Sequence, residues 1–243
     1  MDKDEVLSWL EKKGTRAAVE GLARYGIEAR HAFGVPMGTL KALAKKLGKD
    51  HDLSIALWGS GWYEARLLAA LVGDPECVTR RQMNAWAAGF ENWGDCDTVC
   101  FKLFDQTPFA WEKMPQWAGS PREFVKRGAF ALMACLALHD KAGSDEQFVA
   151  LLPLIEQGAK DDRNFVKKGV SWALRSIGRR NAALNESAVV VARRLALSEE
   201  PSARWVGKDA LRELASPKVR AQMARKAQLR DKPKTGRKKR TTR

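Results

Sequence analysis

A short block of sequence near residue 124 recurs twice, and this internal repeat restricts the fold more than any other feature. Residues 124–129 read Phe-Val-Lys-Arg-Gly-Ala, residues 165–170 read Phe-Val-Lys-Lys-Gly-Val, and residues 205–208 give a weaker echo, Trp-Val-Gly-Lys. Successive copies start 41 and 40 residues apart, which is the period of solenoids built from helix pairs. Such repeats share a continuous core and leave a concave face for a partner.

The rest of the chain agrees with an all-α fold. Helical periodicity dominates, no convincing alternating strand is present, and Gly and Pro separate segments of ordinary helix length. Ser120-Pro121 and Ser216-Pro217 have the pattern of a helix cap followed by proline at the first helical position. We therefore predict a right-handed α-solenoid, an α-α superhelix, over residues 1–231.

Charge is distributed unevenly along the 243 residues. The formal net charge is +14, but residues 218–243 contain twelve Lys and Arg and a single acid, so residues 1–217 carry only +3. Residues 232–243 have no apolar face to bury, and we predict a disordered basic tail that contacts nucleic acid. A basic groove on the solenoid must then come from segregated charge, and each repeat contributes a basic residue: Arg127, Lys168 and Lys208.

Cysteine usage gives no sign of a disulfide framework or a secreted protein. Cys96 with Cys100, and Cys135 with His139, are i, i+4 pairs that would supply four ligands to a structural zinc ion. Neither pair has the usual zinc-ligand spacing, so we interpret these cysteines as buried apolar residues and predict no metal and no cofactor. No apolar run reaches the length of a membrane span, and we expect a cytoplasmic protein.

The predicted helix over residues 163–180 has two different faces. Its core face is made of Val166, Val170, Ala173 and Ile177. The opposite face carries a stripe of Lys168, Trp172, Arg175 and Arg179. A ring among cations suits a nucleic-acid surface, where cations contact phosphates and the ring contacts a base or sugar. The alternative is a tryptophan shielded by the next repeat and flanked by solvated charges.

The preceding copy has the same arrangement, with Arg127 opposite its core face and beside Ala131 and Ala134. Small neighbours leave room for a ligand to approach Arg127, although a single arginine more often is solvated or paired with an acid.

The segment over residues 91–100 places an aromatic ring and a carboxylate on the same side of a helix. Trp93 and Asp97 are four residues apart, so one turn brings them together. The alternative is helix capping by Asn92 or Asp95, with Asp97 complementing the helix dipole.

Together these motifs resemble the AlkD-like DNA alkylation repair family, HEAT-repeat glycosylases that excise cationic alkylpurines. The family's Trp-x-x-x-Asp motif is matched by residues 93–97, its groove arginine by Arg127, and its late tryptophan by Trp172 within residues 168–175. The early Ala-Arg-Tyr is matched by residues 23–25. The chain departs from the pattern at three positions: Asn92, Asp95 and Gly128.

The resemblance implies a DNA glycosylase that needs no cofactor and does not flip the base into a pocket. Asp97, Trp93 and Trp172 would be the catalytic residues. DNA-binding residues would be Arg127, Tyr25, Lys168, Arg175 and Arg179. The expected partner is duplex DNA with purines alkylated at N3 or N7, bound by a nucleoid-associated monomer. The alternative is a non-catalytic repeat scaffold for nucleic acid or protein, because a repeat fold does not determine function. The two alternatives differ at Asp97, which would face the basic groove in an enzyme and solvent in a scaffold.

Overall fold

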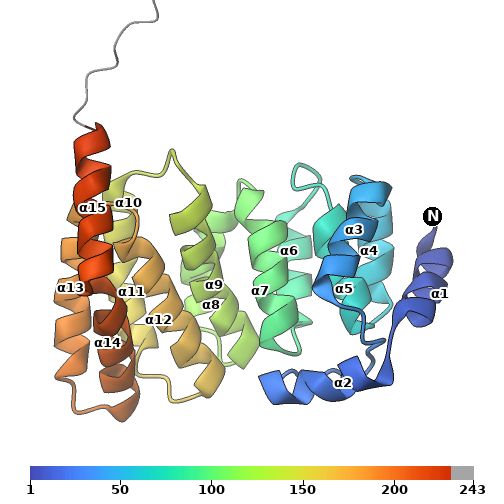
Figure 1. Ribbon diagram of the computed structural model, residues 1–243, viewed down its shortest axis with the longest axis horizontal. Coiled ribbons are helices and arrows are strands. Elements are labelled where there is room, and N and C mark those ends of the chain that lie inside the picture. The colour runs from blue at the N-terminus through green and yellow to red at the C-terminus, as the bar shows by residue number, and fades with distance from the viewer. Residues whose placement is uncertain (231–243) are drawn as a thin grey trace, which may run out of the picture.

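The computed structural model describes residues 1–230, which fold into helices without any strand, as the sequence predicts (Figure 1). The elements are α1 (Lys3–Lys13), α2 (Arg16–Leu22), the 3-10 helix η1 (Ala23–Tyr25), α3 (Met37–Leu47), α4 (His51–Gly59), α5 (Tyr63–Val72), α6 (Arg80–Ala88), α7 (Trp93–Lys102), the 3-10 helix η2 (Phe104–Gln106), α8 (Ala110–Ala118), α9 (Glu123–His139), α10 (Asp145–Val149), α11 (Leu152–Gly158), α12 (Asn164–Gly178), α13 (Ala182–Ala196), α14 (Pro201–Leu214) and α15 (Pro217–Arg230).

The helices form two layers that run the length of the molecule (Figure 1). In one layer each helix packs against the next, in the order α3, α5, α7, α9, α12 and α14. The other layer supplies a partner to most of these helices, and the pairs are α4 with α5, α8 with α9, α11 with α12, and α13 with α14. The three copies of the sequence repeat therefore fall on equivalent helices, α9, α12 and α14, of consecutive helix pairs.

The core runs continuously between the two layers. The predicted core face of α12 is confirmed, because its four apolar residues are fully buried: Val166, Val170, Ala173 and Ile177. Helix α9 differs from the prediction, since every residue from Arg127 to Ala137 is buried. It packs against α7, α8 and α12, and Ala131 and Ala134 keep at most 1% of their surface exposed, so they leave little open surface beside Arg127.

Two predicted helix starts have different outcomes. Helix α15 begins at Pro217 as expected, and the Val219 amide donates to the Ser216 hydroxyl at 3.3 Å. Helix α9 begins at Glu123, after Pro121, because Ser120 forms a local turn by accepting a hydrogen bond from the Arg122 amide at 3.2 Å. The prediction at Ser120-Pro121 is therefore wrong by two residues.

The segment of α2 and η1, called the crossing segment below, runs across the lower ends of neighbouring helices instead of joining a layer (Figure 1). Neither element has a buried residue. The segment is attached at its start, where the Thr15 amide donates to the Gly34 carbonyl at 3.3 Å. Gly34 has a φ of +79°, and a Cβ there would lie 2.2 Å from the Thr15 oxygen, so only glycine fits this crossing.

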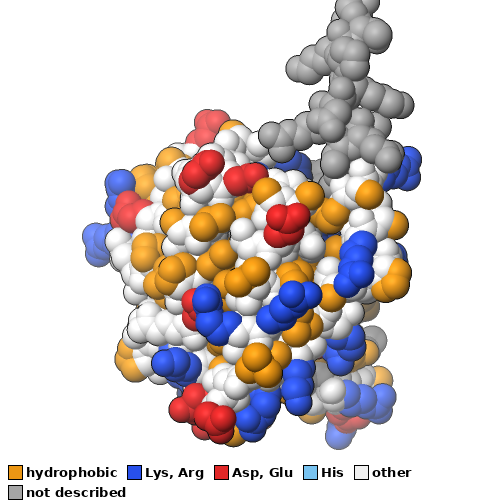
Figure 2. All heavy atoms as spheres, turned by 90° about the vertical axis from the view of Figure 1, so that its left-hand side faces the viewer, with side chains coloured by type: hydrophobic (Ala, Val, Ile, Leu, Met, Phe, Trp, Pro, Cys, Tyr) orange, Lys and Arg blue, Asp and Glu red, His pale blue; other side chains and the backbone are white. Residues whose placement is uncertain are grey.

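The C-terminal end of the solenoid is made by α13, α14 and α15 (Figure 1). Basic and hydrophobic side chains intermingle on this face (Figure 2). Val190 of α13 and Leu197, which follows that helix, are exposed. The predicted domain limit at residue 231 and the predicted basic tail over residues 232–243 lie outside the described residues. Within the described part, no helix combines the length and the apolar character that crossing a membrane requires.

Candidate active site and nucleic-acid interface

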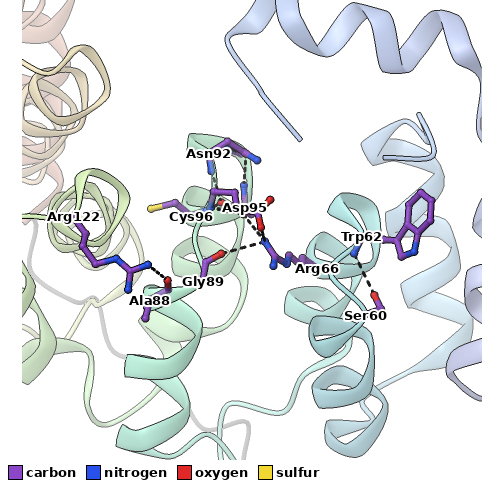
Figure 3. Close-up of polar contacts among 11 residues, drawn as sticks. Ser60, Trp62, Arg66, Ala88, Gly89, Asn92, Asp95, Cys96 and Arg122 are labelled. Atoms are coloured by element: carbon purple, nitrogen blue, oxygen red, sulfur yellow. Dashed lines mark hydrogen bonds and ion pairs between the residues drawn. The ribbon is translucent and has the colours of Figure 1, made fainter. Parts of the chain in front are cut away.

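Helix α7 is capped by Asn92 and Asp95, which leaves Asp97 available for another role (Figure 3). The Asn92 side-chain oxygen accepts from the Gly94 amide at 2.8 Å and from the Asp95 amide at 3.1 Å. The Asp95 carboxylate accepts in return from the Asn92 amide at 3.3 Å. This reciprocal capping box is the interpretation that the sequence allowed for these two residues. It does not extend to Asp97, which lies in the second turn.

Asp95 is fully buried beneath this cap. Its carboxylate lies 3.6 Å from Arg66, whose guanidinium also contacts the Glu91 carboxylate and the Gly89 carbonyl, each at 3.1 Å (Figure 3). Burial raises the pKa of Asp95 to about 6, although backbone amides and Arg66 act in the opposite direction. Asp95 therefore stabilises the start of α7 from a buried position and does not reach the surface.

Asp97 forms a two-pronged ion pair with Arg127. The Arg127 Nε donates to Oδ1 at 2.8 Å, and Nη2 donates to Oδ2 at 2.7 Å. The Arg127 Nη1 also donates to the Phe165 carbonyl at 2.6 Å, so one guanidinium ties together α7, α9 and α12. Burial raises the pKa of the Asp97 carboxyl, and the charge and hydrogen bonds of Arg127 oppose that rise.

The ion pair forms part of the wall of a cleft of about 310 Å³ on the α7–α14 layer. The lining residues are Trp93, Asp97, Arg127, Lys168, Trp172, Arg175, Trp205 and Asp209. The Asp97 side chain keeps 20% of its surface exposed, against 8% for Arg127. Asp97 thus faces a cleft that it shares with Trp93 and Trp172. This is the arrangement that the sequence analysis associates with an enzyme.

Trp93 is oriented by the crossing segment. Its indole Nε1 donates to the Tyr25 carbonyl at 2.8 Å, across 68 residues of sequence. Gly26 follows with a φ of +65°, and a Cβ there would lie 3.0 Å from the ring of Phe165. The Tyr25 side chain itself is 70% exposed. The segment therefore holds one ring of the cleft in place and presents a tyrosine to solvent beside it.

The basic stripe of α12 is more closely paired than its sequence indicates. Arg175 donates to Glu213 at 2.7 Å and lies 3.7 Å from Asp209, while Arg179 contacts Glu213 at 3.2 Å. Lys168 is exposed, and its Nζ lies 6.0 Å from the Phe165 ring centre. Arg175 of α12 and Arg179, which follows that helix, are thus paired with acids, whereas no ion pair forms at Lys168 among the described residues.

Sequence reasoning did not identify Trp205, Asp209 and Glu213 as part of this region. These three residues are spaced at i, i+4 and i+8 on α14. The repeat echo at Trp205 marks the position, but the pairing of acids on α14 with cations on α12 depends on how two helices pack, which periodicity alone does not give.

A second cleft of about 420 Å³ continues from the first one. The two share Trp172, and the second is lined by residues of α7, α9, α12 and α15, among them Phe101 and Gln222, and by Lys141. The candidate interface is therefore a groove along several repeats, and the Asp97 site lies within it.

Cys96, Cys100 and His139 have hydrogen-bond partners within the protein. Cys96 donates to the Phe124 carbonyl at 3.4 Å, Cys100 lies 3.7 Å from the Gly128 carbonyl, and both are fully buried. His139 contacts the Asp105 carboxylate through Nδ1. Among residues 1–230 no group of three or more His, Cys, Asp or Glu has a geometry suited to a metal ion.

Comparison with known proteins identifies the family and the fold of the chain. The family model described as DNA alkylation repair enzyme matches residues 6–214. No curated protein matches the chain. The chain is similar to a solved structure, with a TM-score of 0.73 and 20% sequence identity. The match covers 87% of this chain and 95% of the other chain. It is described as a new family of proteins related to the HEAT-like repeat DNA glycosylases with affinity for branched DNA structures. That likeness establishes the HEAT-like repeat fold, and the family match over most of the sequence shows that the chain belongs to the DNA alkylation repair enzyme family.

Proposed function

We propose that this protein is a DNA glycosylase that hydrolyses the N-glycosidic bond of purines alkylated at N3 or N7 in duplex DNA. The observation that carries the proposal is the position of Asp97, whose carboxylate faces a cleft lined by Trp93 and Trp172. A helix-capping role does not account for this position, because Asn92 and Asp95 already form the capping box of α7.

The chemistry of the substrate fits a site with one carboxylate. A purine alkylated at N3 or N7 is cationic, so it leaves without protonation by a general acid. The sugar then develops oxocarbenium character, which a nearby negative charge stabilises. Asp97 supplies that charge and orients the attacking water, while the negative ring faces of Trp93 and Trp172 favour the same cationic character.

Arg127 orients the carboxylate. Its two-pronged hydrogen bond fixes the plane of the Asp97 carboxylate, which a lysine cannot do. Each terminal nitrogen of a guanidinium carries two N–H groups, and the bonds to Asp97 and Phe165 use one on each. The second N–H groups are the donors that we assign to a backbone phosphate beside the lesion.

The open character of the site supports a reaction without flipping of the base into a pocket. Trp93 and Trp172 are partly exposed, and Trp205 is 38% exposed at the same cleft. Enzymes that extrude a base enclose it between side chains. Here the rings of Trp93 and Trp172 present a surface on which the sugar of a duplex nucleotide rests.

The test is release of methylated bases from alkylated duplex DNA by the purified protein. We expect wild type to release 3-methyladenine and 7-methylguanine, and Asp97→Asn to release neither above background. Asp162→Asn is the matched control, because it removes an exposed carboxylate that does not line the cleft. Absence of release by wild type over a range of alkylated substrates would reject the proposal.

A non-catalytic DNA-binding scaffold is the alternative, and the Asp97–Arg127 ion pair itself favours it. A buried pair that joins three helices has a structural use without any chemistry. In that case Asp97→Asn would change the free energy of unfolding and the DNA affinity. Neither the wild-type protein nor any variant would release a base.

A further inference from the structure

Trp205 lines the cleft and does not belong to the buried face of α14. The buried face of α14 is complete without it and consists of Ser202, Ala203, Val206, Gly207, Ala210 and Leu214. The Trp205 side chain is 38% exposed, in a helix that already buries an apolar stripe. A large exposed ring of this kind is informative, because tryptophan is among the side chains with most apolar surface to hide.

Trp205 differs in its exposure from the aromatic residues at the same place in the earlier repeats. Phe124 and Phe165 precede Trp205 at equivalent places in the two earlier copies. Those two rings are 5.6 Å apart, and the Gly26 segment lies against Phe165. The first two aromatic residues of the series are thus covered by each other and by the crossing segment. Trp205, at the end of the series, keeps much of its ring open to the cleft.

The surroundings of Trp205 are cationic. The Lys167 Nζ lies 5.5 Å from the ring centre, Lys168 lines the same cleft, and Lys208 is exposed one turn further along α14. Asp209, the cleft acid on α14, accepts from the Ser171 hydroxyl at 2.6 Å and pairs with Arg212 and with Arg175. Its charge is therefore compensated within the protein. An open ring among lysines is the combination with which proteins hold unpaired nucleotides.

We propose that Trp205 is a stacking platform for a nucleobase displaced from the damaged base pair. This inference rests on the proposed function, because it assumes that the cleft holds the lesion site of a duplex. The ring face stacks on the base, and Lys168 and Lys208 contact the phosphates that flank it. Trp93 and Trp172 then act at the sugar, whereas Trp205 acts on a base and not in the bond-breaking step.

The experiment uses a duplex with a tetrahydrofuran abasic analogue opposite 2-aminopurine, and a fully paired duplex of the same sequence. Trp205→Leu keeps an apolar side chain but has no ring face, whereas Trp205→Phe keeps a ring. We expect Trp205→Leu to weaken binding to the abasic duplex by roughly tenfold or more, the value of one base–aromatic stack. Binding to the paired duplex should change little, and Trp205→Phe should retain most of the preference. Quenching of 2-aminopurine fluorescence on binding should decrease in parallel.

Leu197→Ala is the control, since it removes an exposed apolar side chain that does not line the cleft. Equal preference for the abasic duplex in wild type and in Trp205→Leu would overturn the inference, whether or not the protein excises bases. Loss of that preference in Trp205→Leu, in a protein that releases no methylated base, would support the platform and reject only the glycosylase proposal.

Discussion

Asp97 and Arg127 are 30 residues apart in sequence, yet they share two parallel hydrogen bonds at the wall of the cleft. The arginine is nearly buried, while the carboxylate keeps a fifth of its surface open to the cleft. This asymmetry gives the two residues different roles. Arg127 joins α7, α9 and α12, and the Asp97 carboxylate is the more exposed partner of the pair.

We expect Asp97→Asn to separate catalysis from binding. Single-turnover excision should fall by about a hundredfold or more, because one electrostatic stabiliser is lost. Duplex affinity should stay equal or become slightly tighter, since a negative charge facing phosphate is removed. The free energy of unfolding should decrease by about 1–3 kcal/mol, because Asn keeps an acceptor for Arg127 but no charge. Chemical denaturation and excision measured on the same preparation check both effects. Unchanged excision would remove Asp97 from the mechanism.

Arg127→Lys should show that the geometry of the pair matters in addition to its charge. A lysine cannot form the fork to Asp97 and also reach the Phe165 carbonyl, so we expect a loss of about 2–4 kcal/mol in unfolding free energy and a slower excision rate. In a double-mutant cycle with Asp97→Asn, the coupling energy for unfolding should exceed about 0.5 kcal/mol. Additive effects would mean that the ion pair contributes nothing beyond the two separate side chains.

Asp95 should make the fold less stable as the pH rises. Its pKa in the folded protein is about 6, above the value of 3.8 that is usual for an aspartate. The folded state therefore binds more protons than the unfolded state between about pH 4 and pH 6, and the stability that this group contributes is lost as the pH rises through 6. Asp95→Asn removes this titration. We compare the unfolding free energy of Asp95→Asn minus that of wild type at the two ends of this range. This difference should be more positive at pH 7.5 than at pH 4, by on the order of 2 kcal/mol. Stability curves that run parallel over this range would contradict the prediction.

The sequence predicted those features that follow from a regular repeat. A 41-residue spacing together with a clear apolar stripe placed the core face of α12 correctly, because every helix pair in a solenoid repeats the same packing. The pattern also identified Trp93 and Asp97 as neighbours on α7, and both line the cleft. Local spacing within a single helix was enough for these predictions.

Contacts between helices were not predictable in the same way. The hydrogen bond from Trp93 to Tyr25 and the pairing of Arg175 with Glu213 join different helices. Their formation depends on the rotation of each helix against the next, and a periodic pattern does not define that rotation. For the same reason the sequence placed Arg127 on an open face, whereas α9 is covered on several sides by α7, α8 and α12.

Close packing between α13 and α14 should make Gly207 intolerant of a side chain. A Cβ at this position would lie 2.2 Å from the Ala196 nitrogen and 2.6 Å from the Ala192 oxygen, both backbone atoms that cannot move independently. We expect Gly207→Ala to lower the unfolding free energy by about 3 kcal/mol, the upper part of the overpacking range. Gly38→Ala is the matched control in α3, where nothing lies within 4 Å of the added carbon. It should be neutral or stabilise by up to about 1 kcal/mol. Equal thermal midpoints for the two variants would refute the close approach of α13 and α14.

Residues 232–243 should raise DNA affinity without taking part in the reaction. They contain seven Lys and Arg and no acid, whereas Asp97, Trp93 and Trp172 lie on α7 and α12. Each phosphate contact adds a slope of about −0.9 to the dependence of log affinity on log salt concentration. Deleting this segment should therefore weaken duplex binding at low salt. It should also make the slope of log affinity against log salt concentration shallower, by about 0.9 for each phosphate contact that is lost. A variant with all seven basic residues replaced by Gln keeps the length and should behave like the deletion. The single-turnover excision rate at saturating protein should stay within about twofold of wild type in both variants, because the cleft is intact. A collapse of that rate would place part of the segment in the active site, and a salt slope equal to that of wild type would show that these charges do not contact DNA.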